Sequence, residues 1–579
     1  MRTISTTLCL SLIWLVTSTA WANPQHDGPA VANRPQTALS KGAAATGPES
    51  STSPAAATAP LESTINQRVA ARIAKEEADV AGLTSDAEFL RRITLDLAGR
   101  TPTAAEIQAF ATRVQADPQS ARSQWVDLLL ASPDFDYHLR NELDRLFLAD
   151  IRQDNKWRDY LLEANQQGKT FEDLFREMLL PEYTNPQSEG AAAFLRERVR
   201  DLDTITNDTS VLFFGINISC AKCHDHPLVA DWQQAHYYGM ASFFKRSYVT
   251  KKGFLAERFD GQMKFTTVAG EEKDAKFMFL NGSVADEPAE STSLAEDELK
   301  KINELIQAAE REQDAKVPPL PDFSPRKQLV SLSTAAEGRK LLAQNLVNRT
   351  WARLLGRGLV HPLDQIHSSN PASHPELLRE LTEDTIAHDF DIRRLVRGIV
   401  LSEPYQRSSH WTADTERPAP ELFAVATGRA LTPWQMSLAL AVATMAPDRL
   451  TGVHDAEKWP DSRKSLEGQV TRMTNVLEIP PQTGFQIGVD EALFFSNSDR
   501  FSRDYLSRGA DRIVGHLLKI EDQRQLIESA FLNILNRVPL DTERDAIGQY
   551  LSDRPDRKEA AVEQVVWVLL NSPEFRFNH

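Results

Sequence analysis

Hydrophobic side chains recur at helical spacing along most of the chain beyond residue 60. Phe89, Ile93 and Leu97 lie four residues apart, and the capping-box sequence Ser85–Glu88 stands directly before them. Further segments with the same period follow as far as the only pair of closely spaced cysteines. This pattern predicts an all-helical N-terminal domain, which we place at residues 61–246.

The pattern changes over residues 247–323. Gln262–Val268 and Lys276–Leu280 contain β-forming residues in alternation, which predicts a hairpin or a small sheet. Asp297–Lys316 has the pattern of a strongly charged helix with few apolar positions. Helical periodicity resumes afterwards and defines a second helical domain at residues 324–579. The sequence therefore predicts a mainly α protein of two helical domains with a small β-containing insertion or connector between them.

The end of the chain repeats a pattern from its beginning. Arg100–Glu106 (RTPTAAE) matches Arg537–Glu543 (RVPLDTE). A matching stop segment follows each copy, at Leu129–Phe135 and at Leu569–Phe575, and a looser third stop lies at Val400–Tyr405. Two similar helical modules predict a duplication or pseudo-symmetric packing, because the copies are too few and too far apart for a solenoid.

The first residues have the features of an export signal, predicted at 1–22. Arg2 precedes the apolar run Leu8–Val16, and Ala20–Ala22 has the small-x-small form of a cleavage site. That run is shorter than the roughly 20 residues that span a bilayer, and no later stretch is apolar enough to do so. The competing interpretation is an uncleaved anchor. Residues 23–60 are rich in Ala, Pro and Ser, which predicts a disordered tether.

The charge balance is acidic. The chain has 65 Lys plus Arg against 81 Asp plus Glu, a formal net charge of −16, and the acidic residues are spread along its length. Nucleic acid is therefore not expected as a partner, since contacts to phosphates require a basic face. The sequence predicts an exported protein of the periplasm or cell envelope, with no transmembrane segment after the signal peptide.

The cysteines form the strongest chemical pattern. Of the three in the chain, Cys9 lies in the predicted signal peptide, so the mature protein has only Cys220 and Cys223. His224 follows directly, which completes the C-x-x-C-H signature of covalent c-type haem attachment. In this interpretation the two sulfurs bond the vinyl groups of one haem c and His224 is the proximal iron ligand. Two intervening residues let one turn present both sulfurs to one porphyrin edge.

Other interpretations of the pattern remain open. Zinc would take four ligands in tetrahedral array, namely the two cysteines and two of His224, His226 and His236. A disulfide between the cysteines would need no metal, and the pattern can also arise by chance.

The sixth iron ligand is not fixed by the sequence. Met240 is the nearest thioether and His236 a nearby imidazole, while His226 lies too close to the proximal histidine to reach the opposite face. Aromatic residues from Trp232 to Phe244 could wall a porphyrin. Core packing is the competing interpretation for Met240 and for these aromatic residues.

A second group of polar residues lies within the C-terminal half. His361, Asp364, His367 and His374 stand close together in the sequence, near Arg357. Such a group can serve a polar site, although a histidine beside a proline at a helix start usually has a structural role. The chain lacks the G-x-S-x-G, H-E-x-x-H, P-loop and G-x-G-x-x-G patterns, so the sequence leaves enzymatic activity open.

Long motifs in both halves carry a family resemblance. Phe89–Pro102, Ile218–Pro227 and Tyr237–Phe244 resemble the cytochrome-like domain of unknown function that is abundant in planctomycetes. The segments that resemble its usual C-terminal companion are Asn345–Val360, Ser369–Leu378 and Leu570–His579. The resemblance implies similarity to c-type cytochromes at the C-x-x-C-H pattern only, and it implies no established activity.

The leading hypothesis is a cytochrome-like redox protein with one haem c, which transfers electrons to or from an unknown redox partner. The alternative is a cell-envelope binding or scaffold protein whose Cys/His cluster holds zinc or a disulfide. A catalytic haem is the third possibility.

Overall fold

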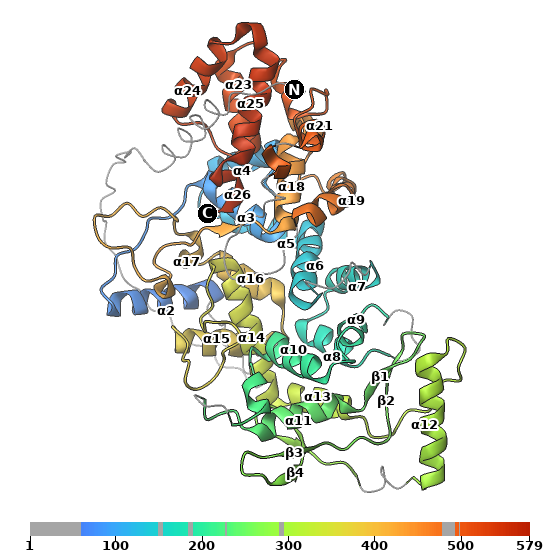
Figure 1. Ribbon diagram of the computed structural model, residues 1–579. Helices are drawn as coiled ribbons and strands as arrows, with labels where there is room; N and C mark the ends of the chain where they lie inside the picture. Colours follow the sequence, from blue (N-terminus) through green and yellow to red (C-terminus); the bar gives the residue numbers. More distant parts are fainter. Residues whose placement is uncertain are drawn as a thin grey trace, which may run out of the picture.

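The computed structural model describes residues 60–148, 155–182, 189–225, 229–288, 294–477, 493–496 and 498–579. These residues form a mainly α-helical protein whose β-structure consists of two-stranded antiparallel sheets, as predicted (Figure 1). The predicted signal peptide and residues 23–59 of the predicted tether lie outside the described residues.

The N-terminal part is helical up to the cysteines. The capping box at Thr103 is complete, and Gly99 ends the preceding helix with a φ of 70°. The elements are α2 (Leu61–Lys75), α3 (Asp86–Ala98), α4 (Ala104–Ala116), α5 (Ala121–Ala131), α6 (Pro133–Leu148), α7 (Asn155–Gln166), α8 (Phe171–Leu179), α9 (Ala193–Arg196), α10 (Leu202–Phe214), η2 (Ser219–Lys222) and α11 (Gln234–Lys245).

The described residues of the insertion form three separate hairpins. They are β1 (Ser247–Val249) with β2 (Leu255–Glu257), β3 (Lys264–Thr266) with β4 (Glu272–Asp274), and β5 (Phe277–Met278) with β6 (Val284–Ala285). The two segments expected to be β-structure thus each pair with a strand of their own, because turns at Gly270 and Gly282 reverse the chain with φ near 84°. The charged helix α12 (Glu296–Arg311) follows and buries Ile302 and Ile306.

The C-terminal part is again helical. Its elements are α13 (Pro325–Thr334), α14 (Ala336–Leu355), α15 (Pro375–Ala387), α16 (Ile392–Val400), α17 (Glu403–Gln406), η4 (Pro420–Leu422), β7 (Arg429–Ala430), α18 (Pro433–Thr444), η5 (Pro447–Arg449), α19 (Trp459–Leu477), α21 (Asp499–Tyr505), α22 (Ile513–Leu517), α23 (Gln523–Ile534), α24 (Asp541–Ser552), η6 (Pro555–Arg557), α25 (Lys558–Asn571), α26 (Pro573–Arg576) and β8 (Phe577–Asn578).

One large hydrophobic core joins the two predicted helical domains. It includes buried side chains from Leu61 to Val470, and it is where α10 packs on α14 and α11 on α13 (Figure 1). A second core is built from residues between Met436 and Phe575. Helix α18 contributes to both cores. The division at residue 324 is therefore not a division between cores.

The repeated modules share the same ion-pair arrangement. Arg100 lies 2.7 Å from Glu106, six residues later, and 2.7 Å from Asp134 in its stop segment. The corresponding pairs of the second copy are Arg537–Glu543 at 2.8 Å and Arg537–Glu574 at 2.6 Å. The sequence repeat therefore corresponds to a repeated three-dimensional unit.

The three stop segments also share one hydrogen bond. The serine hydroxyls donate to the backbone carbonyl three residues earlier, at 2.7 Å for Ser132, 2.6 Å for Ser402 and 2.7 Å for Ser572. The aromatic residue three positions later is buried in each case. The looser third copy of the sequence is thus a structural copy as well.

No helix among the described residues has both the length and the apolar character needed to cross a membrane.

Candidate functional site

The two cysteines lie on one short turn. Cys220 is in the 3-10 helix η2, and Cys223 forms its C-terminal cap. Both side chains are exposed and both thiols are free. Ala221 between them is fully buried, so the turn is anchored by its alanine and presents both sulfurs to solvent.

His224 is exposed beside the turn and its ring is oriented by the backbone. Nδ1 lies 2.7 Å from the carbonyl oxygen of Asp225. Because a carbonyl can only accept, Nδ1 carries the hydrogen and donates it. This tautomer leaves the Nε2 lone pair available, which is the usual arrangement of a histidine that binds a metal.

Helix α11 holds the turn from one side. The buried Gln234 donates from its backbone N–H to Asp225 Oδ1 at 2.8 Å and from Nε2 to the Cys223 carbonyl at 3.2 Å. The hydroxyl of Tyr238 donates to the Lys222 carbonyl at 3.1 Å. Lys222, Cys223 and Asp225 are therefore hydrogen-bonded to α11, and His224 is hydrogen-bonded to Asp225.

A charged contact adds a second attachment, to α10. Lys222 pairs with Asp203, which also accepts a hydrogen bond from the Tyr237 hydroxyl. The hydrogen bond with Lys222, followed by that from Tyr237, lowers the pKa of Asp203 despite partial burial. Burial, followed by the bond to Asp203, raises the pKa of Tyr237 well above its usual value. The carboxylate therefore stays ionised and keeps Lys222 in place at neutral pH.

The candidates for the sixth ligand occupy different environments. Met240 is 0% exposed and belongs to the large core, together with Tyr237, Phe243 and Phe244. Core packing thus describes Met240 and these aromatic residues in this structure.

His236 has a structural role at the start of α11. Its Nδ1 accepts a hydrogen bond from the Gln233 N–H at 3.2 Å, and its ring lies 5.8 Å from that of Trp232. Burial lowers the pKa of His236. His226 lies outside the described residues. Among the residues that are described, no three His, Cys, Asp or Glu side chains come close enough together to hold a metal ion.

The second polar group of the sequence is divided by the fold. His374 is buried, with Nδ1 3.1 Å from Ser373 Oγ and its ring 5.5 Å from that of Phe423. His361 is exposed. Asp364 and His367 instead belong to a segment that contacts the cysteine loop, a proximity across about 150 residues of sequence that no local pattern could indicate.

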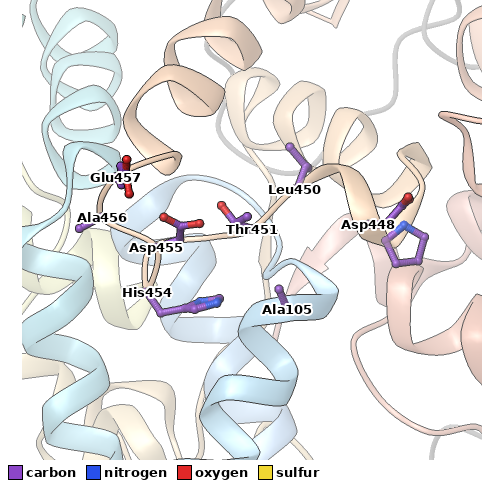
Figure 2. Close-up of a pocket in the computed structure, with 9 residues that line it drawn as sticks. Ala105, Asp448, Leu450, Thr451, His454, Asp455, Ala456 and Glu457 are labelled. Atoms are coloured by element: carbon purple, nitrogen blue, oxygen red, sulfur yellow. The ribbon is translucent and has the colours of Figure 1, made fainter.

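An open cavity of about 600 Å³ lies at another place in the molecule, between the start of α4 and the loop after η5. Figure 2 shows Thr451, His454 and Asp455 around it. Asp455 already accepts a hydrogen bond from the Lys458 N–H at 3.1 Å, so it stabilises its own loop. No sequence pattern indicates this cavity, since its lining residues form no motif.

Comparisons with known proteins give two matches. Residues 64–248 match the family model PSCyt2, described as a protein of unknown function (DUF1549), and residues 325–476 match PSD1, described as a protein of unknown function (DUF1553). No curated protein and no solved structure matches the chain. The cysteine turn lies in the first matched segment and Asp364 in the second. The two matches, DUF1549 followed by DUF1553, stand in the order expected for the cytochrome-like domain and its companion.

Proposed function

We propose that the protein binds one haem c covalently through Cys220 and Cys223, with His224 as the proximal iron ligand, and that it transfers electrons. One observation carries the proposal: two free, exposed thiols lie on a single turn beside an imidazole whose Nδ1 is occupied and whose Nε2 is available. The name of the first matched family model, PSCyt2, also suggests a cytochrome.

The residues present fit the group chemically. Cys220 and Cys223 would hold the haem by adding their thiols across its two vinyl groups, and His224 would supply the nitrogen ligand of the iron. The haem, when bound, supplies one-electron exchange at its iron. Because both sulfurs are exposed, the attachment site is accessible to a redox partner without a change of fold. The protein's own residues orient the imidazole through Asp225 and fix the turn through Gln234.

Absorption spectroscopy of the purified mature protein tests the proposal. We expect a Soret band that survives extraction with acidic acetone, because thioether bonds retain the porphyrin. A Cys220→Ser/Cys223→Ser double variant is expected to lose that band, and a His224→Ala variant to keep the covalent haem but change its ligation spectrum. A colourless wild-type protein with one zinc ion per chain would instead support the zinc alternative, and a colourless protein without metal the disulfide.

Export to the periplasm or cell envelope is part of the same proposal, since haem attachment of this kind takes place outside the cytoplasm. Cell fractionation and N-terminal sequencing test it. We expect the protein in the exported fraction with Asn23 as its first residue. A cytoplasmic protein that retains Met1 would contradict this part of the proposal.

A further inference from the structure

We infer that the companion domain positions the cysteine site. Its Asp364–Ser368 segment binds the chain on both sides of the Cys220–His224 turn. Asp231 is the positioning residue through which this segment acts after the turn. The expected effect on haem binding rests on the proposed function. The positioning of the turn rests only on contacts between two segments that belong to different matched domains.

The first attachment lies directly before the turn. Ile216 forms a β-bridge with Gln365, and the Asn217 N–H donates to the Asp364 carbonyl at 2.9 Å. The Ile366 N–H donates back to the Gly215 carbonyl at 3.0 Å. These backbone bonds fix the point at which the chain leaves α10.

The side chain of Asn217 connects this attached segment to the turn by hydrogen bonds. Its Oδ1 accepts hydrogen bonds from the Ser219 N–H at 3.1 Å and from the Ser219 hydroxyl at 2.7 Å, at the start of η2. A shift of the Asp364 segment would therefore move Asn217 and, with it, the first residue of the turn that carries Cys220.

The second attachment lies after the turn. The carboxylate of Asp231 accepts from the Ser368 N–H at 2.8 Å and from the Ser368 hydroxyl at 2.7 Å. Burial raises the pKa of Asp231, but the two hydrogen bonds from Ser368, followed by the charges of His367 and His236, lower it overall. The ionised carboxylate is the stronger acceptor, so the bond is strongest at neutral pH.

The same segment therefore holds the loop at residues 216–217 and again at residue 231, while α11 holds the turn between them. These attachments restrict the conformational freedom of residues 216–225, which carry both cysteines and His224. The side chain of His367 lies within this piece, and its buried Nδ1 has no hydrogen-bond partner among the described residues. The second domain thus positions the sulfurs although it contributes no thiol.

The test compares two aspartates with the same kind of partner. Asp231→Ala removes the acceptor of Ser368. Asp117→Ala is the matched control, because Asp117 likewise accepts from the N–H and the hydroxyl of one serine, Ser120, but does so at the end of α4. Both variants are made in the full chain.

Hydrogen exchange of the amides of residues 217–225 is measured first, in protein without haem. We expect Asp231→Ala to exchange about fivefold faster there, which corresponds to about 1 kcal/mol of lost hydrogen bonding, and Asp117→Ala to leave this segment unchanged. Ser368→Ala, made from the companion side, is expected to change it in the same direction and less than additively with Asp231→Ala.

Covalent haem per chain and the ligation spectrum are measured second. We expect Asp231→Ala to bind clearly less haem than Asp117→Ala at equal thermal stability. Equal exchange in the two aspartate variants would overturn the inference. Faster exchange in Asp231→Ala together with a wild-type protein that never binds haem would leave the structural inference standing and overturn the proposed function instead.

Discussion

At the scale of single residues, Asp96 shows how the fold joins distant segments. Its carboxylate, 2% exposed, accepts hydrogen bonds from the Tyr405 hydroxyl at 2.7 Å, from Arg429 at 2.7 and 2.9 Å, and from Asn578 at 2.9 Å. These partners come from α17, from β7 and from the last strand of the chain. Burial, followed by the neighbouring Asp96, raises the pKa of Tyr405 well above its usual value. Asp96 therefore holds α3 to three C-terminal elements at once.

Removing this carboxylate is expected to be costly. Asp96→Ala leaves the partly buried Arg429 guanidinium without its counter-charge and the buried Tyr405 and Asn578 side chains without their acceptor, and we expect the free energy of unfolding to fall by about 3–5 kcal/mol. Chemical denaturation measures the change. Asp127→Ala is the control, since its pair with Arg397 has exposed fractions of 52% and 39% and should contribute less than about 1 kcal/mol. Similar losses in the two variants would contradict the role assigned to Asp96.

Buried histidines predict how stability depends on pH. Burial lowers the pKa of His138 to about 4, whereas an unfolded chain keeps it near ~6.5. Between these values the unfolded state binds more protons, so stability falls as the pH is lowered through about 6.5 and continues to fall towards 4. We expect His138 alone to account for a loss of about 2 kcal/mol at pH 5 relative to pH 7.5.

A His138→Gln variant isolates this effect. It cannot be protonated, so its free energy of unfolding should decline less between pH 7.5 and pH 5 than that of the wild type, even if the variant is less stable overall. Urea denaturation at the two pH values gives the comparison. An identical decline in both proteins would show that His138 is not buried in its neutral form.

At the scale of elements, the sequence predicted what local patterns determine. The capping box at Thr103 and the two copies of the R-x-P-x-x-x-E turn appear where they were expected, since each depends on residues close together in the chain. The hairpin or small sheet expected from Gln262–Val268 and Lys276–Leu280 is present as two separate hairpins, because the turns at Gly270 and Gly282 decide the pairing. The position of His374 before a proline at a helix start favours a structural role, but its contact with Phe423 follows only from the packing of the fold.

The candidate site shows the same limit. Its chemical groups, Cys220, Cys223 and His224, could be recognised from spacing alone. The residues that support these groups could not be recognised in this way. Gln234 resembles any other polar residue of a helix, and only the structure shows its hydrogen bonds to Cys223 and Asp225. The Asp231–Ser368 contact joins residues 137 positions apart, so it follows only from the packing of one domain on the other.

The repeated modules differ in burial, and this predicts unequal costs for equal substitutions. Arg100 and its partners Glu106 and Asp134 are at most 1% exposed, whereas Arg537 is 23% exposed. Arg100→Met leaves the buried Glu106 carboxylate without its counter-charge and takes one of two cationic partners from Asp134, which keeps Arg463, and we expect a loss of about 3–5 kcal/mol in the free energy of unfolding. Arg537→Met should cost less, about 1–2 kcal/mol, because water reaches Arg537 itself and Glu574, which is 13% exposed, although Glu543 is buried. Denaturation curves of both variants provide the measurement, and a reversed order would contradict this ranking.

At the scale of the whole molecule, the two matched domains depend on each other. The large core takes side chains from both sides of residue 324. Buried ion pairs also cross that boundary: Arg463 binds Asp134, Arg140 binds Glu467 and Arg326 binds Glu257. Separation would expose the shared core to water and leave these charges without partners, which are the two most destabilising changes available to a fold of this size.

We therefore expect that residues 60–323, produced alone, will not unfold in a cooperative transition and will bind a dye that reports exposed apolar surface. The same fragment, produced together with residues 324–579, should form a complex that restores the transition, because the complex restores both the core and the ion pairs. Circular dichroism melts and dye fluorescence measure both outcomes.

A cooperative melt of the isolated N-terminal fragment would show instead that the boundary predicted from the sequence is a true domain boundary. In that case the companion domain would contact the cysteine loop without positioning it. The amides of the loop should then exchange hydrogen at the same rate in the fragment as in the full chain. The fragment experiment thus also decides, independently of haem, whether the two domains act as one unit at the cysteine site.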